Sequence, residues 1–146
     1  MKETVVKTIV ICSNCNRLNR VDIGKSQPKC GQCKSDLILH GGVQEVSASG
    51  LQALIQSSPI PVVVDFWAPW CGPCRNFAPT FESASLQFGE AYAFAKINTE
   101  EHPDISQRFG IRGIPTLIVF KNGSELTRQS GAMPLPMFID YLSQLK

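Results

Sequence analysis

The sequence has no run of hydrophobic residues long enough to cross a membrane. A spanning helix needs about 18–20 apolar residues in succession, and no segment of the 146 residues comes close to this length. The apolar run at residues 5–11 is short, contains Lys7 and continues into cysteines without a cleavage-like site. We therefore expect no signal peptide, a cytoplasmic protein and no membrane partner.

Aromatic residues are absent from the first 65 positions, Phe66 being the first. Proteins that bind single-stranded nucleic acids stack bases on aromatic side chains, so this absence argues against such a partner. Residues 1–42 carry seven Lys and Arg against three Asp and Glu, whereas the remainder carries seven against nine. The two parts therefore differ in chemistry, but the slight basicity of the first part does not predict nucleic-acid binding.

The missing export signal also bears on the cysteines, because structural disulfides persist mainly in oxidising compartments. The six cysteines form three CxxC pairs: Cys12 and Cys15, Cys30 and Cys33, and Cys71 and Cys74. In a reducing compartment such pairs indicate metal binding or redox catalysis. We assign metal binding to the first two pairs and redox catalysis to the third.

The first two pairs are separated by 14 residues, a spacing typical of paired turns that hold a tetrahedral zinc ion through four thiolates. The apolar residues Ile11 and 37–39 can pair as strands or cover the site. A segment of about 40 residues has too small a core to fold alone, so a metal would supply stability. Iron in place of zinc, two redox pairs, or free thiols in a disordered tail are the alternatives.

The third pair lies between a predicted strand, residues 62–67, and a predicted helix that begins near Pro73. Proline is favoured in the first helical turn, which places Cys71 at the helix N-terminus, where amides and the helix dipole favour a thiolate. A thiolate attacks disulfides, and Cys74, one turn on, can resolve the mixed disulfide. Asp65, inside the apolar strand, is our candidate general base for Cys74; a satisfied structural carboxylate is the alternative.

The segment Val-Asp-Phe-Trp-Ala-Pro-Trp-Cys-Gly-Pro-Cys at residues 64–74 resembles the active-site segment of thioredoxins. Segments 109–116 and 120–123 also match that family, and the resemblance covers about residues 43–146. It implies an α/β thioredoxin fold, a central mixed β-sheet flanked by helices, and reduction of protein disulfides. Gly72-Pro73 between the thiols resembles the reducing members of the family.

With the first two CxxC pairs added, the whole chain resembles a narrower group, the bacterial thioredoxins with an N-terminal zinc motif, often called the second thioredoxin. Segments 66–70 and 74–79 also suggest this group. The predicted organisation is a small zinc-ribbon-like module at residues 1–42, called the N-terminal module below, and a thioredoxin domain at 43–146. Gly41-Gly42 would form a hinge between them.

The family resemblance implies roles for further residues. It places a cis-proline at Pro115, which would leave the backbone of Ile114 free to pair with an extended substrate segment. Gly131 would form part of the substrate groove, and Trp70, next to Cys71, would line it. Lys96 would lie near Asp65 and tune its ionisation; an ordinary solvent-directed lysine is the alternative. The family often has an Asp where Thr99-Glu100 stands here.

Hydrophobic periodicity and turn residues predict the remaining elements of the second part. Asn122-Gly123 predicts a tight hairpin, and Ser47 or Ser49 predicts a helix start. Strands are expected at 43–46, 61–67, 92–98, 116–120 and 124–130, and helices from Ser47 or Ser49 to 57, from Cys71 or Pro73 to 89, at 103–109 and at 137–145.

These observations predict a protein disulfide reductase, and the resemblance implies disulfide-containing substrate proteins and regeneration by an NADPH-dependent thioredoxin reductase. Two alternatives remain open. The N-terminal module could be the working part, binding a protein or nucleic acid, with the second part as scaffold. Oxidation of the first four cysteines could also eject the metal and alter reductase activity.

Overall fold

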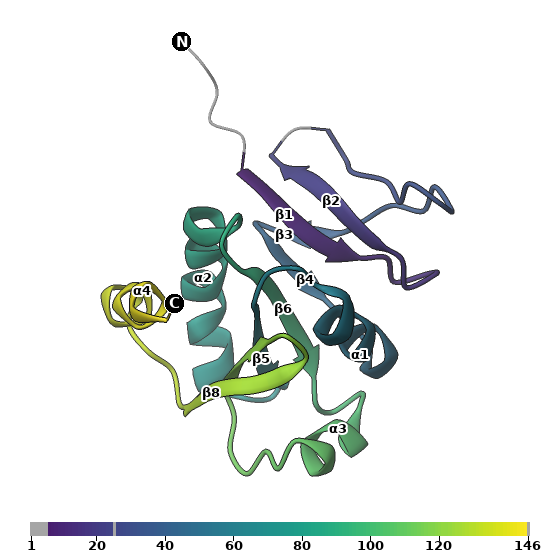
Figure 1. Cartoon of the computed structure of the whole chain (residues 1–146). Helices are drawn as coiled ribbons and strands as arrows, with labels where there is room; N and C mark the ends of the chain where they lie inside the picture. The colour runs from purple at the N-terminus through teal and green to yellow at the C-terminus, as the bar shows by residue number, and fades with distance from the viewer. Residues whose placement is uncertain (1–5, 25, 146) are drawn as a thin grey trace.

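The computed structural model describes residues 6–24 and 26–145; Val5, the start of the apolar run, lies outside them. The described chain forms a six-stranded mixed sheet, a two-stranded hairpin and helices on both faces of the larger sheet (Figure 1). The hairpin pairs β1 (Val6–Ile11) with β2 (Leu18–Ile23). The larger sheet has the order β3-β4-β6-β5-β7-β8. Its strands are β3 (Leu39–His40), β4 (Val43–Glu45), β5 (Val62–Trp67), β6 (Ala93–Asn98), β7 (Thr116–Lys121) and β8 (Ser124–Ser130).

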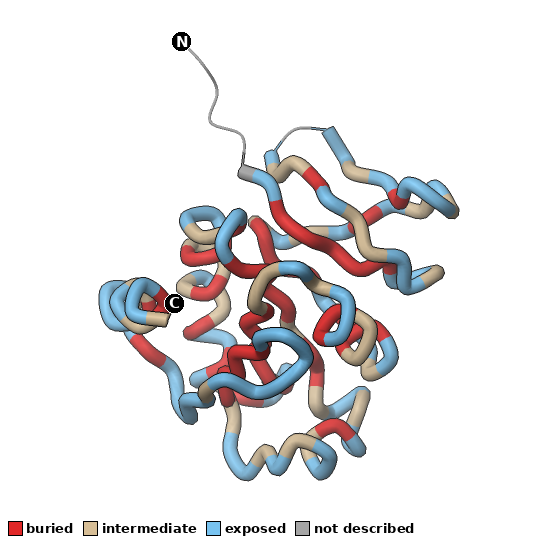
Figure 2. Tube along the Cα trace, in the orientation of Figure 1, coloured by how far each residue is buried: buried red, intermediate tan, exposed pale blue. Residues whose placement is uncertain are grey.

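The large sheet lies between two layers, as the buried segments in Figure 2 indicate. One face packs against α2 (Gly72–Phe88) and α4 (Leu135–Gln144), with Phe77, Phe81 and Phe138 in a shared aromatic cluster. The other face packs against α1 (Ala48–Ser57), α3 (Pro103–Arg108) and strand β1. These findings confirm the predicted α/β thioredoxin-like architecture. Among the described residues, no helix has the length and apolarity that crossing a bilayer requires.

Strand β5 is a central strand, parallel to β6 and antiparallel to β7. Its residues from Val62 to Phe66 are all buried, which explains the continuous apolar run, since a strand covered on both faces does not alternate. Its carboxyl end leads directly to the start of α2. This strand–turn–helix unit fixes the position of the third CxxC pair.

Local signals placed most boundaries well. Ser47 caps α1 by accepting a hydrogen bond from the amide of Gly50. Asn122 and Gly123 have φ values of 53° and 82° and form the predicted hairpin. Helix α4 begins at Leu135, two residues before the predicted start, with Pro136 in its first turn. Proline is accommodated there because the first helical amides have no partner within the helix.

The predicted hinge at Gly41-Gly42 is wrong. The two glycines form the turn between β3 and β4, with Gly41 at φ +63°. The amide of Gly42 donates to Ser85 Oγ on α2 at 2.8 Å, and a Cβ at Gly42 would lie 3.0 Å from the Ser85 carbonyl oxygen. Because β3 belongs to the large sheet, strand pairing in this sheet begins before residue 42. The division into units 1–42 and 43–146 stays a prediction.

The hairpin strand β1 is joined to the large sheet through Gln44 on β4. The Gln44 side-chain oxygen accepts from the amide of Ile11 at 2.8 Å, and its nitrogen donates to the carbonyl of Ile9 at 2.7 Å. Gln44 is buried, and both isoleucines pack into the core beside α1. The amide side chain thus pairs with the free edge of β1 and fixes the hairpin to the sheet.

Candidate redox site and four-cysteine cluster

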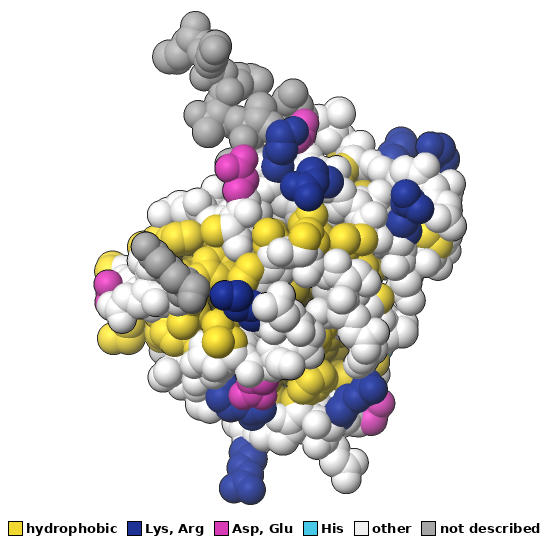
Figure 3. All heavy atoms as spheres, viewed as in Figure 1, with side chains coloured by type: hydrophobic (Ala, Val, Ile, Leu, Met, Phe, Trp, Pro, Cys, Tyr) yellow, Lys and Arg dark blue, Asp and Glu magenta, His cyan; other side chains and the backbone are white. Residues whose placement is uncertain are grey.

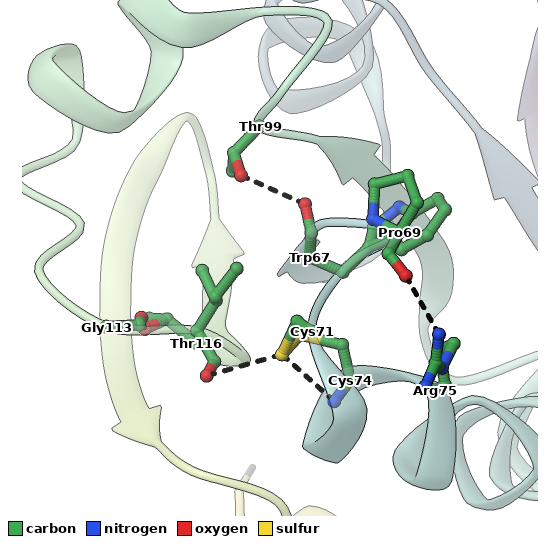
Figure 4. Close-up of a disulfide and its surroundings, with 9 residues drawn as sticks. Trp67, Pro69, Cys71, Cys74, Arg75, Thr99, Gly113 and Thr116 are labelled. Atoms are coloured by element: carbon green, nitrogen blue, oxygen red, sulfur yellow. Dashed lines mark hydrogen bonds between the residues drawn. A yellow bond between two sulfur atoms is a disulfide. The ribbon is translucent and has the colours of Figure 1, made fainter.

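Cys71 and Cys74 form a disulfide at the start of α2, with their Cα atoms 5.2 Å apart (Figure 4). Cys71 is the N-cap residue, and its sulfur accepts from the backbone amide of Cys74 at 3.2 Å. The amide of Cys71 donates to the carbonyl of Ala68, closing the turn after β5. Both sulfurs are largely buried. In the reduced protein, the amide and the helix N-terminus would stabilise a thiolate on Cys71.

The loop before β7 faces this disulfide. The Ile114–Pro115 peptide bond is cis, which confirms the predicted isomer. The carbonyl oxygen of Ile114 lies 3.7 Å from Cys71 Sγ. The amide of Gly131 donates to the carbonyl of Pro115 at 2.8 Å. Two chain segments distant in sequence therefore meet at the dithiol.

A groove of about 470 Å³ runs beside Cys71. Trp70 is 67% exposed on its wall. Neither Pro115 nor Gly131, both expected in the substrate groove, is among its lining residues; Pro115 follows the lining residue Ile114 and is hydrogen-bonded to Gly131. The lining residues are Trp70, Cys71, Gly72, Pro73, Thr99, Ser106, Ile111, Arg112, Gly113 and Ile114. Sequence analysis gave no role to Ser106, Ile111 or Arg112, although the last two lie in the matched segment 109–116.

A second cavity, of about 280 Å³, lies behind the disulfide and connects Asp65 with Cys74. Asp65 is 2% exposed, and its Oδ1 has no hydrogen-bond partner in the described part of the chain. Burial raises the pKa of this carboxyl to about 7, against the opposing effect of the Lys96 charge. Asp65 can therefore exchange a proton near neutral pH, and it shares a cavity with the cysteine that would need to lose one.

Lys96 lies opposite Asp65 in the register of β5 and β6. Among the described residues its ammonium forms no ion pair with Asp65; it lies 3.8 Å from a carboxylate oxygen of Glu45 and 4.9 Å from the centre of the Trp67 ring. Its effect on Asp65 is therefore electrostatic and through space. The register thus places Lys96 beside Asp65, where its charge lowers the pKa of the carboxyl as the resemblance implied, although the two side chains form no ion pair. The Lys96 side chain is 19% exposed and is not directed freely to solvent.

The other four cysteines come together at one end of the β1–β2 hairpin. Their sulfurs all lie within 4.8 Å of one another, and the pairs Cys12–Cys33 and Cys15–Cys30 are each 3.6 Å apart. Zinc–sulfur bonds of about 2.3 Å in a tetrahedron place sulfurs about 3.8 Å apart. The donor set therefore fits a single tetrahedral metal ion, and these four residues could hold it.

Both CxxC turns of the cluster have the same backbone pattern. In each, the first cysteine's amide donates to the carbonyl five residues on, and its carbonyl accepts from the amide four residues on. The residue at the fourth position has a positive φ, 60° in one turn and 67° in the other. These positions are Arg17 and Asn16 for Cys12, and Ser35 and Lys34 for Cys30. The repeat presents two pairs of sulfurs symmetrically to one point.

The thiols of the cluster influence one another. The Asn14 side-chain amide donates to Cys33 Sγ at 3.5 Å and, with Ser35, lowers the pKa of that thiol to about 5. Burial and the neighbouring sulfurs outweigh a backbone hydrogen bond from Arg17 and raise the pKa of Cys15 to about 12. Four thiolates would repel one another at these distances, and a cation bound between them would offset that repulsion.

Leu37 covers this cluster by packing with Cys12 and Cys30, and Leu39 packs against the same residues. Ile11 pairs within the β1–β2 hairpin, whereas Ile38 is 59% exposed, so the expectation for residues 37–39 holds for Leu37 and Leu39 only. Ion pairs join Lys7 to Asp22 and Lys29 to Asp36. In the view of Figure 3, Lys and Arg side chains lie in separate groups over the hairpin end of the molecule, with acidic side chains among them. Part of the positive charge of residues 1–42 is thus neutralised locally.

A family model described as Thioredoxin matches residues 42–144. The chain belongs to the thioredoxin family. Thioredoxins are disulfide oxidoreductases, and the Cys71–Cys74 disulfide is consistent with an active-site dithiol of that kind.

Individual thioredoxins match at similar identity. Thioredoxin C-3 of Corynebacterium nephridii is 39% identical over 127 residues, which cover 86% of each chain. Thioredoxin 1 of Synechococcus elongatus is 47% identical over 83 residues, 57% of this chain and 77% of the relative. Thioredoxin 1 of Nostoc sp. is 42% identical over 90 residues, 62% of this chain and 84% of the relative. The first of these matches is too long to fit within residues 42–146, so it extends into the N-terminal module.

Proposed function

We propose that this thioredoxin reduces disulfides of other proteins and that its N-terminal module holds a zinc ion. The observation that carries the first part is the Cys71–Cys74 disulfide at the N-terminus of α2, opposite the cis bond at Pro115. The second part is supported by the four sulfurs within 4.8 Å of one another.

In the proposed reaction the Cys71 thiolate attacks one sulfur of a substrate disulfide. A mixed disulfide forms and the other substrate sulfur leaves as a thiolate. Cys74 then transfers its proton to Asp65, which lines the same cavity behind the disulfide, called the inner cavity below. The Cys74 thiolate attacks Cys71 Sγ. This step releases the second substrate sulfur as a thiolate. The substrate has then gained two electrons, and Cys71 and Cys74 are joined in a disulfide.

The proposed substrate site is the groove beside Cys71. Its exposed indole at Trp70 offers an apolar contact, and the cis bond at Pro115 orients the Ile114 backbone toward the sulfur. An extended substrate segment would add to this backbone as a strand does, with Gly131 beside it. By family resemblance, an NADPH-dependent thioredoxin reductase would return the dithiol to its reduced form.

For the cluster we propose zinc in a structural role, bound by Cys12, Cys15, Cys30 and Cys33. When bound, the ion would neutralise the thiolates and stabilise a small module with a limited core. The long match to Thioredoxin C-3 and the four-sulfur cluster support our proposal that the protein is one of the bacterial thioredoxins that carry an N-terminal zinc motif.

The test of the reductase is turnover of a disulfide-bonded protein with NADPH and thioredoxin reductase. We expect Cys71→Ser to abolish NADPH consumption and Cys74→Ser to accumulate a mixed disulfide with the substrate. Asp65→Asn should slow resolution on the order of 100-fold or more at neutral pH, because a positioned general base contributes about 10²–10⁴-fold. Undiminished turnover in Cys71→Ser would refute the proposal and favour a function of the N-terminal module alone.

Native mass spectrometry before and after mild oxidation tests the metal. One zinc retained, with the mass of two hydrogens lost, would support a structural ion beside one working dithiol. Loss of zinc together with the mass of six hydrogens would instead show that the N-terminal cysteines are themselves redox-active. Absence of zinc from freshly prepared protein would reject the zinc assignment.

A further inference from the structure

Three charged residues form a row across neighbouring strands of the large sheet. Glu45 on β4 lies opposite Lys96 on β6, and Lys96 lies opposite Asp65 on β5. Residues in register on adjacent strands point to the same face, and adjacent strands are about 4.8 Å apart. The row therefore lies on the face covered by α2, the face that holds the inner cavity.

Lys96 occupies the middle of this row, and among the described residues its ammonium lies within ion-pair distance of Glu45 but not of Asp65. Its ammonium lies 3.8 Å from Glu45 and over the Trp67 ring, while Asp65 Oδ1 has no hydrogen-bond partner in the described chain. The Lys96 side chain is 19% exposed and that of Glu45 is 44% exposed. A largely buried ammonium thus takes the more exposed carboxylate on β4 as its partner and forms no ion pair with the more deeply buried carboxylate on β5.

Few other charges face Asp65. On α2, Arg75 and Glu82 line the same cavity, as does the thiol position of Cys74. The Arg75 guanidinium is directed to the carbonyl of Pro69, at 3.4 Å. On the opposite neighbour, β7, the residue in register with Asp65 is the apolar Leu117. Lys96 is therefore the cation best placed to pair with Asp65, and its position decides how strongly the carboxylate is stabilised.

We propose that Glu45 is a positioning residue for the proton-transfer step: it holds the Lys96 ammonium away from Asp65 and so leaves that carboxylate able to take the proton of Cys74. A close Lys96–Asp65 ion pair would stabilise the ionised carboxylate and make it a weaker base. This inference rests on the proposed role of Asp65 as the base in resolution.

The position of Glu45 is itself fixed from the other face of β4. Successive strand residues point to opposite faces, so Gln44 meets β1 while Glu45 meets Lys96. The two hydrogen bonds from Gln44 to Ile9 and Ile11 hold this short strand in place. Docking of the N-terminal hairpin and placement of the Glu45 carboxylate are therefore properties of the same three-residue strand.

The experiment compares Glu45→Gln with Glu90→Gln in the full-length, metal-loaded protein. Glu90 is exposed beyond the end of α2, and its substitution removes the same charge without changing the row. The first readout is the carbon NMR titration of the Asp65 carboxyl in the reduced protein. The second is the pH profile of mixed-disulfide resolution.

Glu45→Gln frees Lys96 to approach Asp65 and removes a like charge, and both changes favour the ionised carboxylate. We expect the Asp65 midpoint to fall by on the order of half a pH unit, a modest shift because Glu45 is partly screened by solvent. The rising limb of the pH profile should move in the same direction. Glu90→Gln should change neither. An unchanged or raised midpoint in Glu45→Gln, or an equal fall in Glu90→Gln, would overturn the inference.

A double substitution separates the action of Lys96 from a direct effect of Glu45. In a Lys96→Met background, removing the Glu45 charge should shift the Asp65 midpoint much less than in the wild type. A shift of full size there would show that Glu45 does not act through Lys96, and would also overturn the inference. If Asp65→Asn leaves the resolution rate and its pH profile unchanged, Asp65 is not the base in resolution. The NMR titration of Asp65 would still show whether Glu45 acts on Asp65 through Lys96, because it does not depend on that role.

Discussion

Replacing Gln44 by leucine tests how firmly the N-terminal hairpin is joined to the thioredoxin domain. The Gln44 side chain is buried and makes two hydrogen bonds, of 2.8 Å and 2.7 Å, to the backbone of Ile11 and Ile9. Leucine has a similar size but no polar atoms. The substitution would therefore leave one amide and one carbonyl of β1 buried without partners.

The expected cost follows from these two groups. An unsatisfied buried donor or acceptor costs about 1–3 kcal/mol, so the pair costs roughly 2–6 kcal/mol, partly offset by about 1 kcal/mol or more from burying the apolar leucine. The resulting net loss of about 1–5 kcal/mol would be a substantial share of a typical unfolding free energy of about 5–15 kcal/mol. Urea unfolding of both proteins at the same excess of zinc measures the difference, because the contribution of metal binding is then the same in each and cancels.

Hydrogen exchange gives a local readout, because the Ile11 amide should exchange faster in Gln44→Leu while amides in β5 change only by the global loss of stability. Gln56→Leu is the matched control, since Gln56 is exposed on α1 and should change stability by no more than about 0.5 kcal/mol. A loss in Gln44→Leu no larger than in this control, with unchanged Ile11 exchange, would refute the reasoning.

Three further predictions concern the buried carboxyl, the cluster and the β3–β4 turn. Burial raises the pKa of Asp65 from 3.8 to about 7, so the unfolding free energy of the wild type falls as the pH rises through this range. Asp65→Asn should lack that fall and be more stable than the wild type above pH 7 by on the order of 4 kcal/mol. If the unfolding free energies of the two proteins, measured in urea, depend on pH in the same way, the prediction is wrong. Cys30→Ser removes one of four thiolates and should weaken zinc binding at least about 10-fold in a chelator competition while disulfide reduction persists; unchanged zinc affinity would exclude Cys30 as a ligand. Gly42→Ala places a Cβ about 3.0 Å from Ser85 and should lower the unfolding free energy, measured by thermal unfolding, by about 1–3 kcal/mol. Gly113→Ala places a Cβ that meets no atom within 4 Å and should be nearly neutral. Equal effects of the two substitutions would show that the β3–β4 turn can shift to accommodate the added methyl group.

Much of the fold could be predicted because its signals are local. The cap at Ser47, the turn at Asn122-Gly123 and the apolar run of β5 each depend on a few adjacent residues. The spacing of the CxxC pairs similarly predicted the four-sulfur cluster that the structure brings together. The cis bond at Pro115 followed from family resemblance, because no local pattern distinguishes a cis from a trans proline there.

The features that sequence analysis missed depend on contacts between distant segments. A glutamine within a short strand does not reveal that its amide meets the backbone of β1 more than 30 positions earlier. Gly41-Gly42 has the composition of a flexible hinge, and only the approach of α2 makes it a tight turn. Lys96 lies opposite Asp65 as the family resemblance implied, but its contact with Glu45 was missed, because Glu45 becomes its neighbour only through the parallel pairing of β4 and β6.

Strand β4 gives a physical reason why the two parts of this chain need not act independently. On one face Gln44 bonds β1, which leads within one residue to Cys12 of the cluster. On the other face Val43 lines the cavity of Asp65 and Cys74, and Glu45 holds Lys96. Any rearrangement of the cluster that moves β1 must either break two buried hydrogen bonds or move β4. Moving β4 would change the electrostatic surroundings of Asp65, so this three-residue strand is the segment through which a rearrangement of the cluster would reach the redox site.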